Sequence, residues 1–134
     1  MSAAKQKGTA AETAVVTYLS QFFDRVERRT LSGKNDKGDI SLDKDFVIEV
    51  KNHQRMELAT WCDEAITEKA NAGARFGVVW HKRTRKGSPG DWYVTMSGED
   101  FTNMVADVLF ARDVRNQLDT WESNAKQLPE GPTD

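Results

Sequence analysis

The chain has 134 residues and a formal net charge of −2; 38% of the residues are hydrophobic and 30% are charged, which is typical of a globular domain rather than a disordered or fibrous chain. The single cysteine, Cys62, excludes an internal disulfide framework and a four-cysteine zinc site. No apolar run approaches the ~20 residues of a membrane span, and the N-terminus lacks the apolar stretch of a secretion signal. We therefore expect a soluble, cytoplasmic protein without a membrane partner, folded as a single domain over residues 1–126.

Basic residues gather in two segments, although the chain as a whole is mildly acidic. Residues 1–35 carry six bases against three acids, and residues 75–90 carry five bases and no acid. The acidic excess lies mostly in residues 91–134, which carry nine acids against three bases. Because backbone phosphates respond to local cation density, such a chain can still present a basic groove to DNA.

The first predicted element is a helix over residues 10–23. Thr9 is a good N-cap, and Glu12, three residues later, completes a capping box. Two apolar stripes end at Phe22 and Phe23, so we expect this helix to be buried over a wide face. Glu12 heads the second stripe and therefore projects toward the protein, where a carboxylate needs a partner.

Both ends of the chain are expected to be less ordered. Residues 1–8 are predicted to form a flexible basic arm, in which Lys5 and Lys7 contact DNA and become ordered on binding. Residues 127–134 contain two prolines and a glycine and are predicted to be a frayed, disordered tail.

The centre of the chain predicts a strand, a loop and a hairpin. Residues 25–30 form the predicted strand, and a loop rich in Ser, Gly, Asn and Asp follows. Residues 39–42 and 46–51 are the predicted arms of the hairpin, because apolar residues alternate in both. Glu49 and Lys51 lie two residues apart on the second arm and therefore project from the same face.

The rest of the chain predicts a parallel strand pair and a long terminal helix. A helix over residues 57–72, followed by the apolar strand 76–80, implies a right-handed crossover. A basic loop, a strand over residues 92–96 and a helix that Ser97 can cap complete the elements; this helix can continue past Trp121. The bases of the loop suit the phosphates of a DNA arm; they are Lys82, Arg83, Arg85 and Lys86.

The residues with the clearest chemistry are Asp39, Glu49 and Lys51. Asp39 lies on the first arm of the hairpin, about level with the other two if the turn is tight. Two carboxylates that converge near a lysine on an apolar strand are costly to bury without compensation. A hard divalent cation such as Mg²⁺ or Mn²⁺ removes that cost, and such ions favour phosphate-bearing substrates.

The pattern Gly38-Asp39, followed ten residues after the aspartate by Glu49-Val50-Lys51, resembles the signature of the PD-(D/E)XK nucleases, with Gly38 in place of the proline. The order of elements also resembles the αβββαβ core of that superfamily, a restriction endonuclease-like α/β fold with a central mixed sheet flanked by helices. More specifically, residues 8–51 are similar to the archaeal-type Holliday junction resolvases that many bacteriophages encode. With the later strands, the resemblance covers residues 8–96.

This resemblance implies a role for each matching residue. Asp39 and Glu49 would bind Mg²⁺, with Mn²⁺ as a substitute, Lys51 would orient the attacking water, and Glu12 would complete the acidic cluster directly or through a metal-bound water. Arg28 or Arg29 would grip the DNA backbone together with Ser32. Because adjacent strand residues point to opposite faces, at most one of the two arginines should reach the site.

The family resemblance also implies a partner and a setting. It predicts a homodimer whose two sites nick opposite strands of a four-way DNA junction symmetrically, in a prokaryotic or phage-infected cell. A nuclease of the same fold that cuts flaps, nicks or duplex ends is an alternative. A DNA-binding module that retains the scaffold without chemistry is another.

Each candidate residue also has a structural alternative. Glu12 could serve only the capping box, and Asp39 could be a turn residue. Glu49 and Lys51 could form a cross-strand ion pair on a solvated face. Ser32 could shape its loop only. The two histidines, His53 and His81, are expected to be exposed or structural, and Cys62 is expected to be a core residue.

Overall fold

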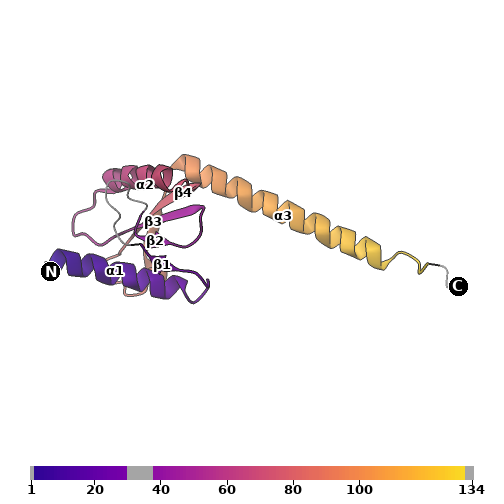
Figure 1. Ribbon diagram of the computed structural model, residues 1–134, viewed down its shortest axis with the longest axis horizontal. Coiled ribbons are helices and arrows are strands. Elements are labelled where there is room, and N and C mark those ends of the chain that lie inside the picture. Colours follow the sequence, from indigo (N-terminus) through magenta and orange to yellow (C-terminus); the bar gives the residue numbers. More distant parts are fainter. Residues whose placement is uncertain (1, 30–37, 132–134) are drawn as a thin grey trace. The chain divides into compact units, whose positions relative to one another are not determined.

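The structure is a computed structural model that describes residues 2–29 and 38–131 (Figure 1). Within them the chain forms two compact units, one ending at Asp100 and the other beginning at Phe101. The first unit is an α/β fold around a five-stranded mixed open sheet, and the second is a helical segment. The α/β class expected from the sequence is confirmed, and the single domain over residues 1–126 stays a prediction.

The strands follow one another across the sheet in chain order. Strands β3 and β4 are parallel, and the other neighbouring pairs are antiparallel. The strands are β1 (Glu27–Arg28), β2 (Ile40–Ser41), β3 (Phe46–Lys51), β4 (Phe76–His81) and β5 (Tyr93–Thr95). The helices are α1 (Ala3–Leu19), α2 (Leu58–Ala72) and α3 (Gly98–Lys126), with a short 3-10 turn, η1 (Pro89–Asp91), before β5.

Helices α1 and α2 cover opposite faces of the sheet (Figure 1). On one face Ile48 and Val50 of β3 pack in a buried cluster with Val15 of α1. On the other face Val79 of β4 packs against Trp61 of α2. Because side chains alternate along a strand, Glu49, between Ile48 and Val50, projects toward α2. This alternation brings a carboxylate under a helix that carries acidic residues of its own.

The predicted hairpin and the predicted parallel pair of strands are both confirmed. Asp43 closes the turn between β2 and β3 with a side-chain bond from the Asp45 N–H to its Oδ1 at 2.9 Å. Helix α2 ends at Gly73, whose φ of 64° is the left-handed conformation that glycine adopts without strain. Gly77 allows α2 to approach β4, because a Cβ at this position would lie 2.5 Å from the Ala65 carbonyl oxygen.

A buried ion pair connects α2, β4 and the first turn of α3. The Lys69 Nζ lies 2.7 Å from Oδ1 of Asp100, which is 1% exposed. The Gly77 N–H donates to the other carboxylate oxygen at 2.9 Å. The Asp100 N–H donates to the Ser97 Oγ at 3.0 Å, so Ser97 caps α3 as predicted.

The beginning of α1 differs from the prediction. The helix begins at Ala3, after Ser2, whose side chain accepts a hydrogen bond from the Lys5 N–H. Thr9 and Glu12 therefore lie inside the helix and form no capping box, and residues 3–8 are helical rather than a flexible arm. The physical reason is that Ser2 supplies an earlier cap, and Ala, Lys and Gln propagate a helix well enough to carry it through Gly8.

The other boundaries shift by a few residues. Strand β1 is shorter than the predicted 25–30, and β5 is shorter than the predicted 92–96. Helix α3 continues past Trp121 as predicted, and residues 127–131 lie in neither helix nor strand. In the described part of the chain, no helix combines the length and the apolar character that crossing a membrane requires.

Candidate active site

The hairpin places Asp39 across from Glu49. The register of β2 and β3 pairs Ile40 with Ile48, and its continuation sets Asp39 opposite Glu49. The Asp39 N–H donates to the Ile48 carbonyl at 3.0 Å, and the Val50 N–H donates to Oδ2 of Asp39 at 2.8 Å. These bonds hold the carboxyl at the edge of β3, beside the strand that carries Glu49.

The charge of the Asp39 carboxylate is disfavoured at this position. Burial is the largest cause and raises its pKa from 3.8 to about 7 together with repulsion from Glu49 and Glu12. The Val50 N–H and the Lys51 charge act in the opposite direction but do not outweigh them. A carboxyl group that is half ionised near neutral pH is a good place for a cation that would displace its proton.

Lys51 lies among the acidic residues and remains protonated. Its Nζ is 2.8 Å from Oε2 of Glu64 and 3.4 Å from Oε1 of Glu49. Burial lowers the pKa of Lys51, but the hydrogen bond that Lys51 donates to Glu64 and the negative charges of Glu49 and Glu64 outweigh it, so the pKa lies above its ordinary value. Lys51 is therefore a fixed cation at the end of β3.

Helix α2 adds two carboxylates that the sequence reasoning missed. Oxygen atoms of Glu49, Glu64 and Glu68 all lie within 4.8 Å of one another. Glu68 is 5% exposed, and its Oε2 is 3.5 Å from the position that a Cβ on Gly38 would take. The signal was present, because Glu68 continues the buried stripe of Trp61 and Ala65 along the helix. Glu12 became a candidate because its carboxylate lies on a buried stripe of a helix, and Glu68 meets the same criterion.

Glu12 is held by an arginine rather than placed in that cluster of three. The Arg28 Nη2 and Nε donate to Oε2 of Glu12 at 2.6 and 3.1 Å. The Arg29 guanidinium lies 3.4 Å from the Ser41 Oγ, so the two arginines contact different elements, as their alternation predicts. Glu12 acts on Asp39 through its charge. Ser32 lies outside the described residues.

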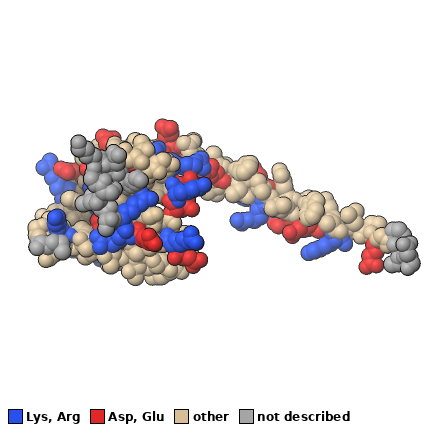
Figure 2. Space-filling model, in the orientation of Figure 1, with Lys and Arg blue, Asp and Glu red and all other residues tan. Residues whose placement is uncertain are grey.

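A basic hollow of about 310 Å³ lies beside the end of β3. The Lys82 N–H donates to the Lys51 carbonyl at 2.9 Å, so the basic loop is attached directly to the strand with the acidic residues. Bases from α1 and from the loop line the hollow together with polar residues; the lining residues are Lys7, Asn52, His53, Gln54, Lys82, Arg83, Thr84 and Arg85. Figure 2 shows Lys and Arg side chains close together on this unit, with Asp and Glu side chains among them. Lys5 and Lys86 are exposed but do not line the hollow.

One side chain and one backbone carbonyl of the basic loop are also held by the fold. The Arg83 guanidinium donates to the Asp91 carbonyl at 2.9 Å and lies 4.5 Å from the centre of the Tyr93 ring. The Lys86 carbonyl accepts a bond from the Trp92 indole at 2.8 Å. The loop therefore presents its bases from an anchored backbone.

The histidines and the cysteine have structural surroundings. His81 is buried, its Nε2 lies 2.9 Å from the Thr95 Oγ1, and burial lowers its pKa. His53 is exposed and lies against Trp61, with 5.4 Å between the ring centres. Cys62 is half-buried and packs beside Trp61 and Ala65, close to the predicted core position.

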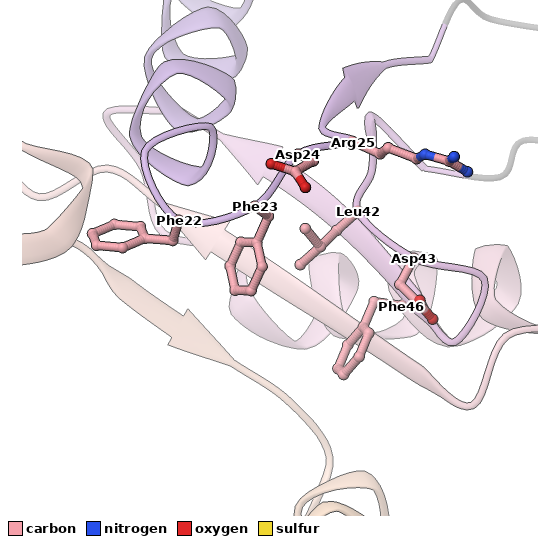
Figure 3. Close-up of a pocket in the computed structure, with 7 residues that line it drawn as sticks. All are labelled: Phe22, Phe23, Asp24, Arg25, Leu42, Asp43 and Phe46. Carbon is pink, nitrogen blue, oxygen red and sulfur yellow. The ribbon is translucent and has the colours of Figure 1, made fainter.

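A larger apolar hollow lies elsewhere on the α/β unit. It has a volume of about 680 Å³ and is lined mainly by Phe22, Phe23, Leu42 and Phe46, with Asp24, Arg25 and Asp43 at its margin (Figure 3). Phe22 and Phe23 are 60% and 49% exposed, so the prediction that they are buried on a helix is wrong. The helix ends at Leu19, and the chain then turns back toward β1, which leaves both rings outside the core. None of the predicted site residues that the structure describes lines this hollow.

Comparisons of the chain with protein-family models, with curated proteins and with solved structures found no match.

Proposed function

We propose that this protein is a metal-dependent, structure-selective DNA endonuclease of the PD-(D/E)XK type, and specifically a Holliday junction resolvase. The proposed activity is hydrolysis that makes paired, symmetric nicks in four-way junctions during DNA recombination or repair. The observation that carries the proposal is that Asp39 lies opposite Glu49, with Lys51 on the same strand as Glu49. A purely structural ion pair would not need an additional carboxyl group whose pKa is raised by burial and by its acidic neighbours.

The donors present fit a hard divalent cation. Asp39 and Glu49 would bind it, with Glu64 and Glu68 as further carboxylates close to Glu49. Glu12 lies outside this cluster of three and acts on Asp39 through its charge. All of these donors are oxygen atoms, which suits Mg²⁺ or Mn²⁺ rather than a softer metal. When bound, such an ion supplies Lewis-acid stabilisation of the phosphate and lowers the pKa of a coordinated water.

The chain's own residues supply the remaining functions. Lys51 stays protonated and is held by Glu64 and Glu49, so it can donate a hydrogen bond to a water or to a phosphate oxygen at a defined position. Glu12 fixes the Arg28 guanidinium near the site, where part of its charge remains available to the DNA backbone. The role of Arg29 stays a prediction, as does that of Ser32.

The basic hollow supports a nucleic-acid substrate. Among the described residues that line it, four are bases and none is acidic. Such a surface recognises phosphates and the shape of the duplex rather than base sequence. We propose branched DNA as the substrate and a homodimer as the active form, because a single site of this size cannot cut both strands of a twofold-symmetric junction at once.

Cleavage of defined DNA structures tests the proposal. The protein is incubated with Mg²⁺ and end-labelled four-way junction, flap or linear duplex, and the positions of the nicks are mapped. Paired nicks in the junction alone support a resolvase, and cutting of flaps or duplex indicates a nuclease of the same fold with another substrate. Binding without cleavage would contradict the enzymatic proposal.

Isosteric variants test the site assignment. Asp39→Asn and Glu49→Gln should abolish cleavage and preserve junction affinity, because both remove anionic ligands without removing a base. Asp24→Asn and Glu57→Gln make the same chemical changes at exposed positions and should cut like the wild type. Normal turnover in either site variant would refute the assignment.

A further inference from the structure

Beyond Asp100, helix α3 exposes large apolar side chains along its length. Leu118 is 56% exposed, Trp121 is 68% exposed and Leu128, just beyond the helix, is 71% exposed. A helix in water is stabilised mainly by burying an apolar face, so a surface of this kind is typical of a helix that packs against another chain. In Figure 2 the charged side chains of this helix lie along one edge and the opposite edge is uncharged.

The spacing of these residues is that of a coiled-coil seam. From residue 111 to residue 128, small or apolar residues recur at alternating intervals of three and four, which are the a and d positions of a heptad repeat. The residues of this seam are Ala111, Val114, Leu118, Trp121, Ala125 and Leu128. We propose that this seam binds the same seam of a second copy of the chain, as an antiparallel two-stranded coiled coil.

The flanking charges favour the antiparallel orientation. Arg115 and Glu122 both occupy e positions, and e positions of antiparallel helices face each other. Two copies would therefore form the Arg115–Glu122 pair twice. In a parallel pair the e positions face g positions, where Phe110 and Gln117 offer no opposite charge.

The sizes of the seam residues favour the same orientation. Antiparallel pairing sets Leu118 against Trp121, Val114 against Ala125 and Ala111 against Leu128, so no layer pairs two alanines or two tryptophan rings. Parallel pairing would set each alanine against its own copy and both Trp121 rings against each other. The antiparallel arrangement therefore distributes side-chain volume more evenly along the seam than the parallel one.

The length of the seam limits its strength. The helical part of the seam, residues 111–126, extends over roughly 24 Å, and pairing the seam would bury on the order of 1,000 Å² in total, near the lower limit for specific interfaces. We expect a dimer that dissociates at micromolar concentrations. This inference gives a contact surface to the homodimer proposed above but rests on α3 alone, so failure of the nuclease proposal would leave it standing.

Sedimentation equilibrium of the full chain without DNA tests the pairing. From 1 to 300 µM, the average mass should rise from that of the 15.1 kDa monomer toward twice this value. Leu118→Glu should weaken association at least tenfold, because it places a charge in the centre of the seam. Asn116→Glu adds the same charge outside the seam and should dimerise like the wild type. A monomer at every concentration, or a dimer unaffected by Leu118→Glu, would overturn the inference.

Charge reversal tests the orientation without altering the seam itself. Arg115→Glu or Glu122→Arg alone sets like charges against each other and should weaken the dimer several-fold. The double variant restores opposite charges and should recover the wild-type affinity, a rescue that misfolding of the helix could not produce. Equal dimerisation by all three variants would contradict antiparallel pairing.

Discussion

The raised pKa of Asp39 predicts that this carboxyl group destabilises the metal-free protein at neutral and alkaline pH. Below about pH 4 the folded and the unfolded chain both hold the proton, so the group has no effect. As the pH rises toward 7, the unfolded chain releases the proton while the folded chain retains it, and the free energy of unfolding falls. Above about pH 7 the folded chain ionises too, and the loss becomes constant. Asp39→Asn removes this titration and keeps an oxygen that can accept the Val50 N–H.

The size of the effect follows from the two pKa values. A rise from 3.8 to about 7 corresponds to about 4 kcal/mol at ~1.4 kcal/mol for each tenfold change in acidity. Solvent around a partly exposed carboxyl group screens the repulsion, so we expect about 2 kcal/mol at pH 8. For a unit of this size, that is a difference of about 10 °C in Tm. Asp39→Asn should therefore be the more stable protein at pH 8, and the difference should shrink toward pH 4.

Urea unfolding in the presence of EDTA, followed by tryptophan fluorescence from pH 4 to pH 8.5, measures the difference. Asp24→Asn, an exposed acid, is the matched control and should follow the wild type. Replacing EDTA with Mg²⁺ or Mn²⁺ should stabilise the wild type more at pH 8 than at pH 5. Parallel pH profiles for wild type and Asp39→Asn would refute the reasoning, because the carboxyl group would then titrate normally.

Two further predictions concern the basic loop and the packing of α2. Replacing the four bases of residues 82–86 with Gln should weaken junction binding and lower the slope of log affinity against log salt by about 2 or more, as measured by fluorescence anisotropy. Gly77→Ala should destabilise the protein by about 2 kcal/mol in urea unfolding, because the new Cβ would overlap the Ala65 carbonyl.

Each of these predictions has a control in the chain. Lys44→Gln removes a base in the hairpin turn, away from the basic hollow, and should leave the salt slope nearly unchanged. An unchanged slope in the loop variant itself would remove the loop from the DNA interface. Gly87→Ala meets no atom within 4 Å and should change stability by less than about 0.5 kcal/mol. Equal stability of the two alanine variants would contradict the close approach of α2 to β4.

Local patterns were sufficient to predict most elements of the fold. The alternation over residues 46–51 predicted a strand with the same bounds as β3. The glycine at position 73 predicted the end of α2, which the structure places at Ala72. These features depend on side-chain periodicity and on backbone conformations available to particular residues, which act over a few neighbours. The prediction failed at α1, where Ser2 caps the helix earlier and the chain turns after Leu19.

The acidic residues of α2 show where local reasoning ends. Sequence spacing marks Glu68 as a charged residue on a buried stripe, but it does not identify the strand beneath that stripe. That Glu68 lies close to the carboxylate of Glu49 becomes evident only when α2 packs over β3. The same holds for the hollow that joins Lys7 of α1 to the loop at residues 82–86.

By itself, the sequence determined the order of elements, the parallel crossover and the presence of Asp39, Glu49 and Lys51 on one hairpin, because periodicity and strand register are properties of short segments. Only the tertiary structure decided which carboxylates come within 4.8 Å of Glu49, and that Arg28 binds Glu12. Distances between side chains from remote segments depend on how helices pack on the sheet, and that packing is decided by the fit of the whole core rather than by any one segment.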